Sequence, residues 1–357
     1  MTELIKDLWP SILTAFFVSA FVSRLLAVIV VKRGKSAPTR TGGSMPLTGG
    51  IGVFLGYFLG LIVLFIKSNL RGLVGIGFLL IFFIWFFIAV FPYFILGTLD
   101  DIFHFKPFQK LSLHFIIIFI QFFLFNLFET EFSCCGVKEI VVQNLFLVTA
   151  LFFFSNSYNF LDNADGHCAS AVLGLTFALL FVLKKPDECS CVPLLLSFAV
   201  LGFLVWNFPA KPVLYLGDAG SLFLGACAPA LIFLFVIGPM QWDKIANVIP
   251  GIFTAVILLA FPLYDTCAVM LLRVLRGQNP TIGGQDHYSH RLMRGGFPLW
   301  LVNLIAFTAA GILPVVFLKL PEGAVYFGPI AIWAFLLFLD VLAAFLRKRG
   351  EGEPELS

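Results

Sequence analysis

Long apolar runs dominate this chain, and they leave it few folds to adopt. Of its 357 residues, 60% are apolar and only 12% are charged, whereas a soluble domain carries about 25% charged residues. A run of about 20 apolar residues can cross a bilayer as a helix. We find eleven such runs, at about 8–31, 48–66, 72–97, 111–129, 139–155, 168–183, 192–208, 220–238, 247–275, 299–318 and 324–346. The sequence therefore predicts an all-α polytopic membrane bundle of about 11 transmembrane helices, with 10 as the alternative because the sixth and seventh runs are short.

The domain organisation follows from the same pattern. No stretch between the runs is long enough for an inserted soluble domain, so residues 1–346 are expected to form a single membrane domain. Residues 347–357 are expected to be a short cytoplasmic tail without fixed structure. The segment before the first run carries acidic residues as well as lysines, and that run is long enough to remain in the membrane. We therefore expect no cleavable signal peptide.

The basic residues predict the orientation. With the N-terminus outside, fourteen Lys and Arg fall in the inner loops and eight in the outer segments, as the positive-inside rule requires. Four polar clusters then lie on the cytoplasmic side. They are Asp100-Asp101, the run 156–166, Asp218, and His287 with His290. Carboxylates beside a bilayer are costly, so clusters gathered on one face indicate a common site.

Two of these clusters have carboxylates suited to metal chemistry. Asp100 and Asp101 are adjacent, and in a low dielectric they need a shared cation or proton. They fit Mg²⁺ binding and proton abstraction, although a solvated helix end would have the same sequence. Asp218 lies in GDAGS. There Gly217 would let the backbone approach a diphosphate at a helix N-terminus, with Asp218 as a Mg²⁺ ligand and Ser221 as the helix cap.

The run NSYNFLDNADG places Asn156, Asn159, Asp162 and Asp165 at intervals of three residues. On a helix this spacing keeps the four side chains near one face. Asn both donates and accepts hydrogen bonds and Asp accepts them, so the stripe suits the edge of a nucleobase and a cation, with Asp162 as a second metal ligand. An ion relay in a transporter would give a similar stripe.

The last cluster is basic. His287, His290, Arg291 and Arg294 follow a Gly-rich loop and together suit a diphosphate. A His-x-x-His metal site is the rival, but no second cluster completes a zinc set. Asp265 lies within the ninth run, either as a functional group or as a structural partner for a neighbouring helix.

Taken in order, the motifs PLTGGI from Pro46, DD, NxxNxxDxxDG, GDAGS and the histidine loop resemble those of the polyprenyl-phosphate N-acetylhexosamine 1-phosphate transferases. The resemblance covers most of the chain. It implies an enzyme of the bacterial plasma membrane with a cytoplasmic active site. Such an enzyme uses Mg²⁺, or Mn²⁺ in its place, to transfer N-acetylhexosamine 1-phosphate from a UDP-sugar to undecaprenyl phosphate, releasing UMP. The implied partners are these two substrates and membrane lipid, without a nucleic acid polymer. The family includes homodimers, and the sequence leaves the oligomeric state open.

The resemblance also implies roles for single residues. Asp218 matches the Mg²⁺ ligand. Asp100 and Asp101 match an essential pair that is assigned either deprotonation of the lipid phosphate or positioning of the metal. Asn159 and Asp162 match residues at the uracil and the nucleotide pocket.

Five further positions match more peripheral parts of the pattern. Asn156 and Asp165 match polar positions of the same loop, and Tyr215 matches an aromatic residue that stacks on the base. His287 and His290 match the outer histidines of the family's loop.

Three positions depart from the family pattern. Ser289 stands where the family has the middle histidine, and Asn163 stands where it has a glycine. The basic residue before PxxGG has no clear counterpart, since Lys35 and Arg40 lie further upstream. The altered histidine loop favours a small donor such as UDP-GlcNAc, as used for O-antigen or teichoic acid, over the MurNAc-pentapeptide donor of peptidoglycan synthesis. The missing glycine bears on the turn, and the missing basic residue leaves the contacts with the sugar open.

Two other classes remain as alternatives. An aromatic prenyltransferase would need a second aspartate-rich helix and has no use for a GDAGS turn. An ion-coupled transporter would place its charges near the bilayer midplane and often shows internal repeats. The cysteines leave one question open, because Cys134 or Cys135 could pair with Cys189 or Cys191 across the outer face, or all four could be thiols.

Overall fold

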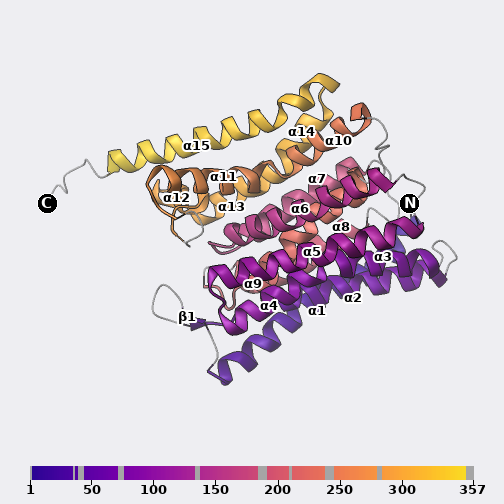
Figure 1. The fold of residues 1–357 in the computed structure, drawn as a ribbon. Coiled ribbons are helices and arrows are strands. Elements are labelled where there is room, and N and C mark those ends of the chain that lie inside the picture. The colour runs from indigo at the N-terminus through magenta and orange to yellow at the C-terminus, as the bar shows by residue number, and fades with distance from the viewer. Residues whose placement is uncertain are drawn as a thin grey trace.

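The computed structural model is a bundle of long helices, as the apolar runs predict (Figure 1). It describes residues 2–34, 37–38, 44–70, 76–132, 137–183, 191–208, 211–237, 245–279 and 284–350. Eight segments are long and apolar enough to cross a membrane, and one bent helix pair makes a ninth. The predicted all-α polytopic fold is therefore confirmed.

The first half of the bundle contains the helices α1 (Thr2–Lys32), α2 (Gly49–Leu70), α3 (Ile76–Ala89), α4 (Phe91–Phe103), α5 (Pro107–Phe132), α6 (Val137–Leu161), α7 (His167–Val182) and α8 (Cys191–Asn207). Two short strands, β1 (Ala37–Pro38) and β2 (Ser44–Met45), pair antiparallel between α1 and α2.

The second half contains α9 (Gly217–Ile232), the π-helix η1 (Phe233–Ile237), α10 (Ile245–Leu258), α11 (Ala260–Leu275), α12 (Tyr288–Arg294), α13 (Leu299–Phe307), the π-helix η2 (Thr308–Ile312), α14 (Leu313–Lys319), the 3₁₀ helix η3 (Glu322–Phe327) and α15 (Gly328–Gly350). The last helix thus continues into the segment 347–350, which we had assigned to the tail. Residues 351–357 lie outside the described part.

Three of the eleven expected runs differ from simple spans. The sixth and seventh form the shorter apolar helices α7 and α8, of 16 and 17 residues. The ninth is broken into α10 and α11, which meet at an angle of 68°. Pro262 explains the break, because proline lacks an N–H group and its ring clashes with the carbonyl four residues earlier, at Leu258, where α10 ends.

Helix α9 forms the centre of the bundle. Within its span 89% of the residues are buried, against 22% for the best windows of α1 and α15. It packs against α2, α4 and α6, and glycines make this close approach possible. A Cβ atom at Gly97 of α4 would lie 2.1 Å from the carbonyl oxygen of Asp218. The first turn of α9 is therefore held directly against the end of α4.

The chain begins at one end of the bundle and α15 ends at the other (Figure 1), as an odd number of crossings requires. β1 and α12 lie at the same end as the last turn of α15 (Figure 1). The C-terminal turns of α4 and α6 and the N-terminal turn of α9 contact one another through their polar side chains. Elements that are far apart in sequence thereby form a single polar site.

Candidate active site

The site begins with the contact between α4 and α9. Asp101, in the last turn of α4, accepts hydrogen bonds from the backbone N–H groups of Asp218 (2.8 Å) and Ala219 (2.9 Å). A carboxylate is favourable there because the first N–H groups of a helix have no partner within the helix. Asp101 therefore caps α9 from a distant segment. We had expected Ser221 to be the cap, but it lies in the second turn of α9, fully buried.

Gly217 makes this cap geometrically possible. Its φ of +77° lies in the left-handed region, which glycine adopts without steric cost. A Cβ atom at Gly217 would lie 2.7 Å from Asp101 Oδ2. The structure therefore explains Gly217 by the turn and by its contact with the carboxylate; its expected contact with a substrate stays a prediction.

Lys110 is the electrostatic centre of the site. Its ammonium lies 2.8 Å from Asp100 Oδ2 and 2.6 Å from Asp218 Oδ2. Asp100 uses its other oxygen to accept the N–H of Phe105 at 2.8 Å. About a third of the Asp218 side chain remains exposed. Two carboxylates from α4 and α9 thus share one cation from α5, and one of them is open to a ligand.

Helix α6 contributes the next part. Asn159 donates from Nδ2 to Asp218 Oδ1 (2.6 Å) and to Ser221 Oγ (2.8 Å). Asn156, one turn earlier, donates to the carbonyl of Phe152 at 2.8 Å. Asn159 is therefore brought into the carboxylate cluster, whereas the described contact of Asn156 stays within its own helix.

The turn after α6 adds two further carboxylates. The pKa of Asp162 is raised well above its usual value by burial and by the charges of Asp218, Asp101 and Asp165. Burial also raises the pKa of Asp165. The turn is held by a contact with the end of α8, since Gly166 donates its N–H to Asn207 Oδ1 at 2.7 Å. The cluster therefore carries more negative charge than Lys110 alone can balance.

The segment before Asp218 is joined to the first sequence motif. Tyr215 donates its N–H to the carbonyl of Pro46, and its own carbonyl accepts the N–H of Gly49, both at 3.0 Å. Leu47 and Tyr215 form a parallel bridge. The PLTGGI motif thus lies directly beside the loop that leads to Asp218, and Tyr215 lies three residues from that carboxylate.

The histidine helix α12 joins the site through the turn after α6. Ser289 donates to Asn163 Oδ1, and the rings of His287 and Phe160 are 5.6 Å apart. The rings of His287 and His290 are 6.2 Å apart. The hydrogen bond joins two of the three positions at which the sequence departs from the family pattern, so each of these residues supplies a partner for the other.

Asp265 holds this helix in place. It accepts the N–H of Tyr288 at 2.7 Å, and its other oxygen lies 3.3 Å from His287 Nδ1. The structure therefore supports the second of our two interpretations of Asp265, a partner for a neighbouring element. The element is the histidine helix, so Asp265 also orients a candidate site residue.

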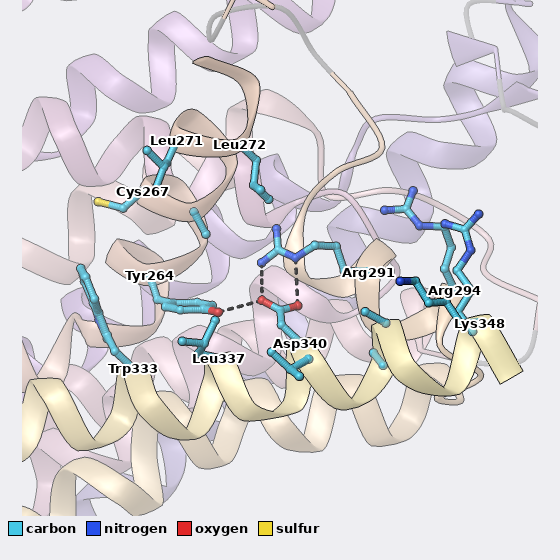
Figure 2. A pocket seen from close by; sticks show the side chains of 15 residues that line it. Tyr264, Cys267, Leu271, Leu272, Arg291, Arg294, Trp333, Leu337, Asp340 and Lys348 are labelled. Atoms are coloured by element: carbon cyan, nitrogen blue, oxygen red, sulfur yellow. Dashed lines mark hydrogen bonds and ion pairs between the residues drawn. The ribbon is translucent and has the colours of Figure 1, made fainter. Parts of the chain in front are cut away.

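Arg291 is placed differently from our expectation. Its guanidinium forms two hydrogen bonds of 2.9 Å with the carboxylate of Asp340 in α15 (Figure 2). It also donates to the carbonyl of Asp286 at 2.7 Å. Asp340 in turn accepts the hydroxyl of Tyr264 at 2.7 Å. In this arrangement Arg291 ties α12 to α15, and its Nη1 lies 3.9 Å from Asp265 Oδ1.

The cluster suits a divalent cation. Its donors are carboxylate oxygens, which Mg²⁺ prefers, and Mg²⁺ is usually held by one or two carboxylates together with substrate phosphates and water. Asp100 and Asp218 already converge on one cationic group. Within the described residues, no three His, Cys, Asp or Glu side chains form a ready-made metal site. The residues therefore fit an ion that arrives with its substrate, held by Asp218 with Asp162 or Asp100 beside it.

The sequence alone did not reveal Lys110 as part of the site, since we had counted it only as a positive charge on the inner side. Lys110 stands directly before the run 111–129, and only the structure, in which α5 begins at Pro107, shows that it lies within the helix. The interpretations that rest on Lys35, Arg40, Cys134, Cys135 and Cys189 lie outside the described residues. Cys191 is buried as the first residue of α8.

Comparison with known proteins agrees with the resemblance of the sequence motifs. The family model described as "Glycosyl transferase family 4" matches residues 81–238. A probable undecaprenyl-phosphate N-acetylglucosaminyl 1-phosphate transferase from Bacillus subtilis is 24% identical over 96% of this chain and 92% of its own length. An undecaprenyl-phosphate alpha-N-acetylglucosaminyl 1-phosphate transferase from Thermotoga maritima is 24% identical over 80% of this chain and 81% of its own length. A phospho-N-acetylmuramoyl-pentapeptide-transferase from Streptococcus thermophilus is 31% identical over only 38% of this chain.

Proposed function

Because this chain belongs to glycosyl transferase family 4, we propose that it transfers N-acetylglucosamine 1-phosphate from UDP-N-acetylglucosamine to undecaprenyl phosphate. An oxygen of the lipid phosphate attacks the β-phosphorus of the nucleotide sugar. The bond from that phosphorus to the bridging oxygen breaks, and UMP leaves. The product is a polyprenyl diphosphate sugar, the first membrane intermediate of a cell-envelope polysaccharide such as O-antigen or teichoic acid.

The observation that carries this proposal is the convergence of Asp100, Asp218 and Asn159 around Lys110. Phosphoryl transfer needs positioning and compensation of negative charge more than covalent chemistry from the protein. A Mg²⁺ ion held by Asp218 and Asp162 would stabilise the charge on the diphosphate. Lys110 provides a cation that can exchange from Asp218 to a phosphate oxygen when the substrates enter.

Asp100 and Asp101 have different tasks in this proposal. Asp101 uses both oxygens to cap α9, so it positions Asp218 and has no oxygen left over. Asp100 has one oxygen on an exchangeable ammonium, and we assign it the proton from the lipid phosphate. Asn159 and Tyr215 are assigned to the nucleotide, and Asn156 and Asp165 to the wall of its pocket.

The histidine helix is assigned to the diphosphate. The ring of His287 lies beside that of Phe160 in the last turn of α6, and Ser289 donates to Asn163 in the turn after it. The ring of His290 lies 6.2 Å from that of His287. Asp265 fixes the orientation of His287. Arg291 acts in this proposal by tying α12 to α15, because its guanidinium is committed to Asp340.

We also propose that the site faces the cytoplasm of a bacterial plasma membrane, with the N-terminus outside. The helix ends around it carry basic residues, including Lys32 at the end of α1, Arg33 directly after it and Lys348 in α15. Such residues are retained on the cytoplasmic side.

Release of UMP tests the proposal. The purified protein is given undecaprenyl phosphate and Mg²⁺ with UDP-GlcNAc, UDP-GalNAc or UDP-MurNAc-pentapeptide in turn. We expect release with UDP-GlcNAc that EDTA abolishes and that Mn²⁺ restores. Release only with the pentapeptide donor would assign the chain to peptidoglycan synthesis instead. No release with any donor, from protein that unfolds cooperatively on heating, would contradict the proposed function.

A further inference from the structure

A second site lies on the opposite side of α12 from the carboxylate cluster. The helices α11 and α15 form the two walls of a groove of about 660 Å³, and α12 closes one end (Figure 2). Neither Asp100, Asp218 nor Asn159 lines it. The groove has the volume of a typical ligand pocket, so its lining indicates what it could hold.

Most of the groove is apolar and faces outward from the bundle. Leu271 of α11 is 59% exposed, and Leu337 and Val341 of α15 are 56% and 61% exposed. Both helices belong to segments that are apolar enough to cross a membrane, so this part of the groove opens toward lipid hydrocarbon. An occupant with a long apolar portion would therefore replace bulk lipid there at little cost.

One end of the groove is strongly basic. Arg294 of α12 and Arg347 and Lys348 of α15 line it, and Arg294 and Lys348 are labelled at the same end of the groove (Figure 2). Partial burial, together with Arg347, Arg291 and Arg276, lowers the pKa of the Arg294 guanidinium. Arg294 donates one hydrogen bond to the carbonyl of Gln285, and the nearby carboxylate of Asp286 offsets the like charges only in part. A further anion among them would therefore be stabilising.

The acidic side chain that lines the groove does not neutralise these basic residues. Asp340 is the one acidic side chain among the described residues that line the groove. It is already engaged by both nitrogens of the Arg291 fork and by the hydroxyl of Tyr264. The groove thus presents Arg294 and Lys348 beside an Arg291–Asp340 pair that is already compensated.

We propose that this groove binds an anionic phospholipid, with an acyl chain along α11 and α15 and the phosphate between Arg294 and Lys348. Basic pockets between transmembrane helices recognise lipid head groups in this way. A soluble phosphate would leave the apolar length of the groove unused. A second copy of the chain would have to bring an anionic group to the basic end and a ridge to the apolar length, whereas one phospholipid supplies both.

Native mass spectrometry tests the proposal without depending on any enzymatic activity. The full-length protein is incubated with an equimolar mixture of phosphatidylglycerol and phosphatidylcholine that carry the same acyl chains. We expect preferential retention of phosphatidylglycerol. Each basic side chain near a lipid head group contributes about fivefold in affinity, or about 1 kcal/mol. The double variant Arg294→Ala/Lys348→Ala should therefore lose at least about tenfold of the preference.

The matched control removes two charges elsewhere at the same end of the bundle. Lys32 and Arg33 are exposed at the end of α1, and Lys32→Ala/Arg33→Ala should leave the preference unchanged. The charge-conserving variant Arg294→Lys/Lys348→Arg should retain it as well. An equal loss in the Lys32/Arg33 control and in the groove variant would show that only total charge matters and would overturn the assignment.

Filling the apolar part separates a lipid from other occupants. Ala344 lines the groove and is exposed, so Ala344→Trp blocks the groove without changing its charge. We expect this variant to lose phosphatidylglycerol, and a large excess of soluble glycerol phosphate not to displace the lipid from the unaltered protein. Displacement by glycerol phosphate would overturn the proposal. Retention of the lipid in Ala344→Trp together with a change from dimer to monomer would assign the groove to a second copy instead.

Discussion

Two clusters of charged residues lie on either side of the histidine helix, and they differ in how their charges are balanced. Around Lys110, the carboxylates of Asp100 and Asp218 share one ammonium, while burial and the neighbouring carboxylates raise the pKa of Asp162. Around Asp340, the carboxylate is matched by a bidentate guanidinium and a hydroxyl. The first cluster is short of positive charge, and in the second the charges are matched.

This difference separates a binding site from a structural connection. A buried carboxylate with an ideal partner mainly fixes geometry, and removing the partner is costly. Carboxylates that lack enough cations are costly in the folded protein, and a metal or a cationic partner that binds there relieves the cost. Uncompensated charge of this kind is expected where a ligand completes the site. We therefore place the chemistry at Lys110 and the scaffold at Asp340.

The largest effect is expected from Asp218→Asn. The amide keeps the shape and the contact with Asn159 in one orientation but loses the negative charge that holds a cation. Loss of even an outer contact of a metal site costs about 10–100-fold in activity, so UMP release should fall by more than about 100-fold. The melting temperature in detergent should fall only slightly, because Lys110 keeps its ion pair with Asp100. Full Mg²⁺-dependent activity would contradict the metal assignment.

Asp340→Asn is expected to lower stability, whereas Asp218→Asn mainly lowers activity. Removing one partner of a buried ion pair costs about 3–5 kcal/mol because the other charge is left unpaired, and both side chains here are about 15% exposed. The melting temperature should therefore drop markedly. The double variant Asp340→Asn/Arg291→Met should recover much of the loss. If Asp340→Asn were as stable as the unaltered protein, the structural role of this cluster would be wrong.

Lys110→Gln tests whether the ammonium occupies the place of a metal. The two carboxylates would then be free, so the Mg²⁺ concentration for half-maximal UMP release should fall by about fivefold, which corresponds to a partly exposed ion pair of ~1 kcal/mol. The maximal rate should also fall, since a cation beside the phosphates is lost. A titration of activity with Mg²⁺ measures both quantities, and an unchanged midpoint would argue against competition between lysine and metal.

Tyr215→Ala tests the nucleotide assignment. Stacking of an aromatic side chain on a base contributes about 1–3 kcal/mol, so the KM for the UDP-sugar should rise by roughly tenfold. The KM for undecaprenyl phosphate should change little. Tyr215→Phe is the matched control and should keep a normal nucleotide KM. Equal increases for both substrates would place the tyrosine elsewhere in the reaction.

The smallest effect is expected from Asp162→Asn in the absence of metal. The pKa of Asp162 is raised in the folded protein, so the folded state binds its proton more tightly than the unfolded state. Its contribution to stability is therefore lost as pH rises above the unfolded value of 3.8 toward the folded one. The variant should melt slightly higher than the unaltered protein at neutral pH and differ less at acidic pH. A lower melting temperature at neutral pH would mean that Asp162 has a stabilising partner.

Sequence reasoning succeeded where the signal is local. Each apolar run became a helix or a helix pair, and the motif residues Asp100, Asn159 and Asp218 came together as one cluster. Lengths of apolar runs and the order of short motifs are properties of neighbouring residues. They need no knowledge of which helices touch.

The sequence did not predict contacts between residues that lie far apart in the chain. Asp218 and Lys110 are 108 residues apart, and nothing in either segment indicates their pairing. Arg291 was assigned to a diphosphate because Asp340, 49 residues away, was hidden in an apolar run. The break between α10 and α11 had a local signal in Pro262, but a proline within a membrane helix does not by itself specify a bend of 68°.

The most direct test of the central claim is a count of bound Mn²⁺ ions by electron paramagnetic resonance, in the presence of UDP-GlcNAc. The account predicts one ion per chain in the unaltered protein and its loss in Asp218→Asn, with the ion retained in the Lys32→Ala/Arg33→Ala control. An equal number of bound ions in the unaltered protein and in Asp218→Asn would contradict the claim that the Lys110 cluster is the metal and diphosphate site.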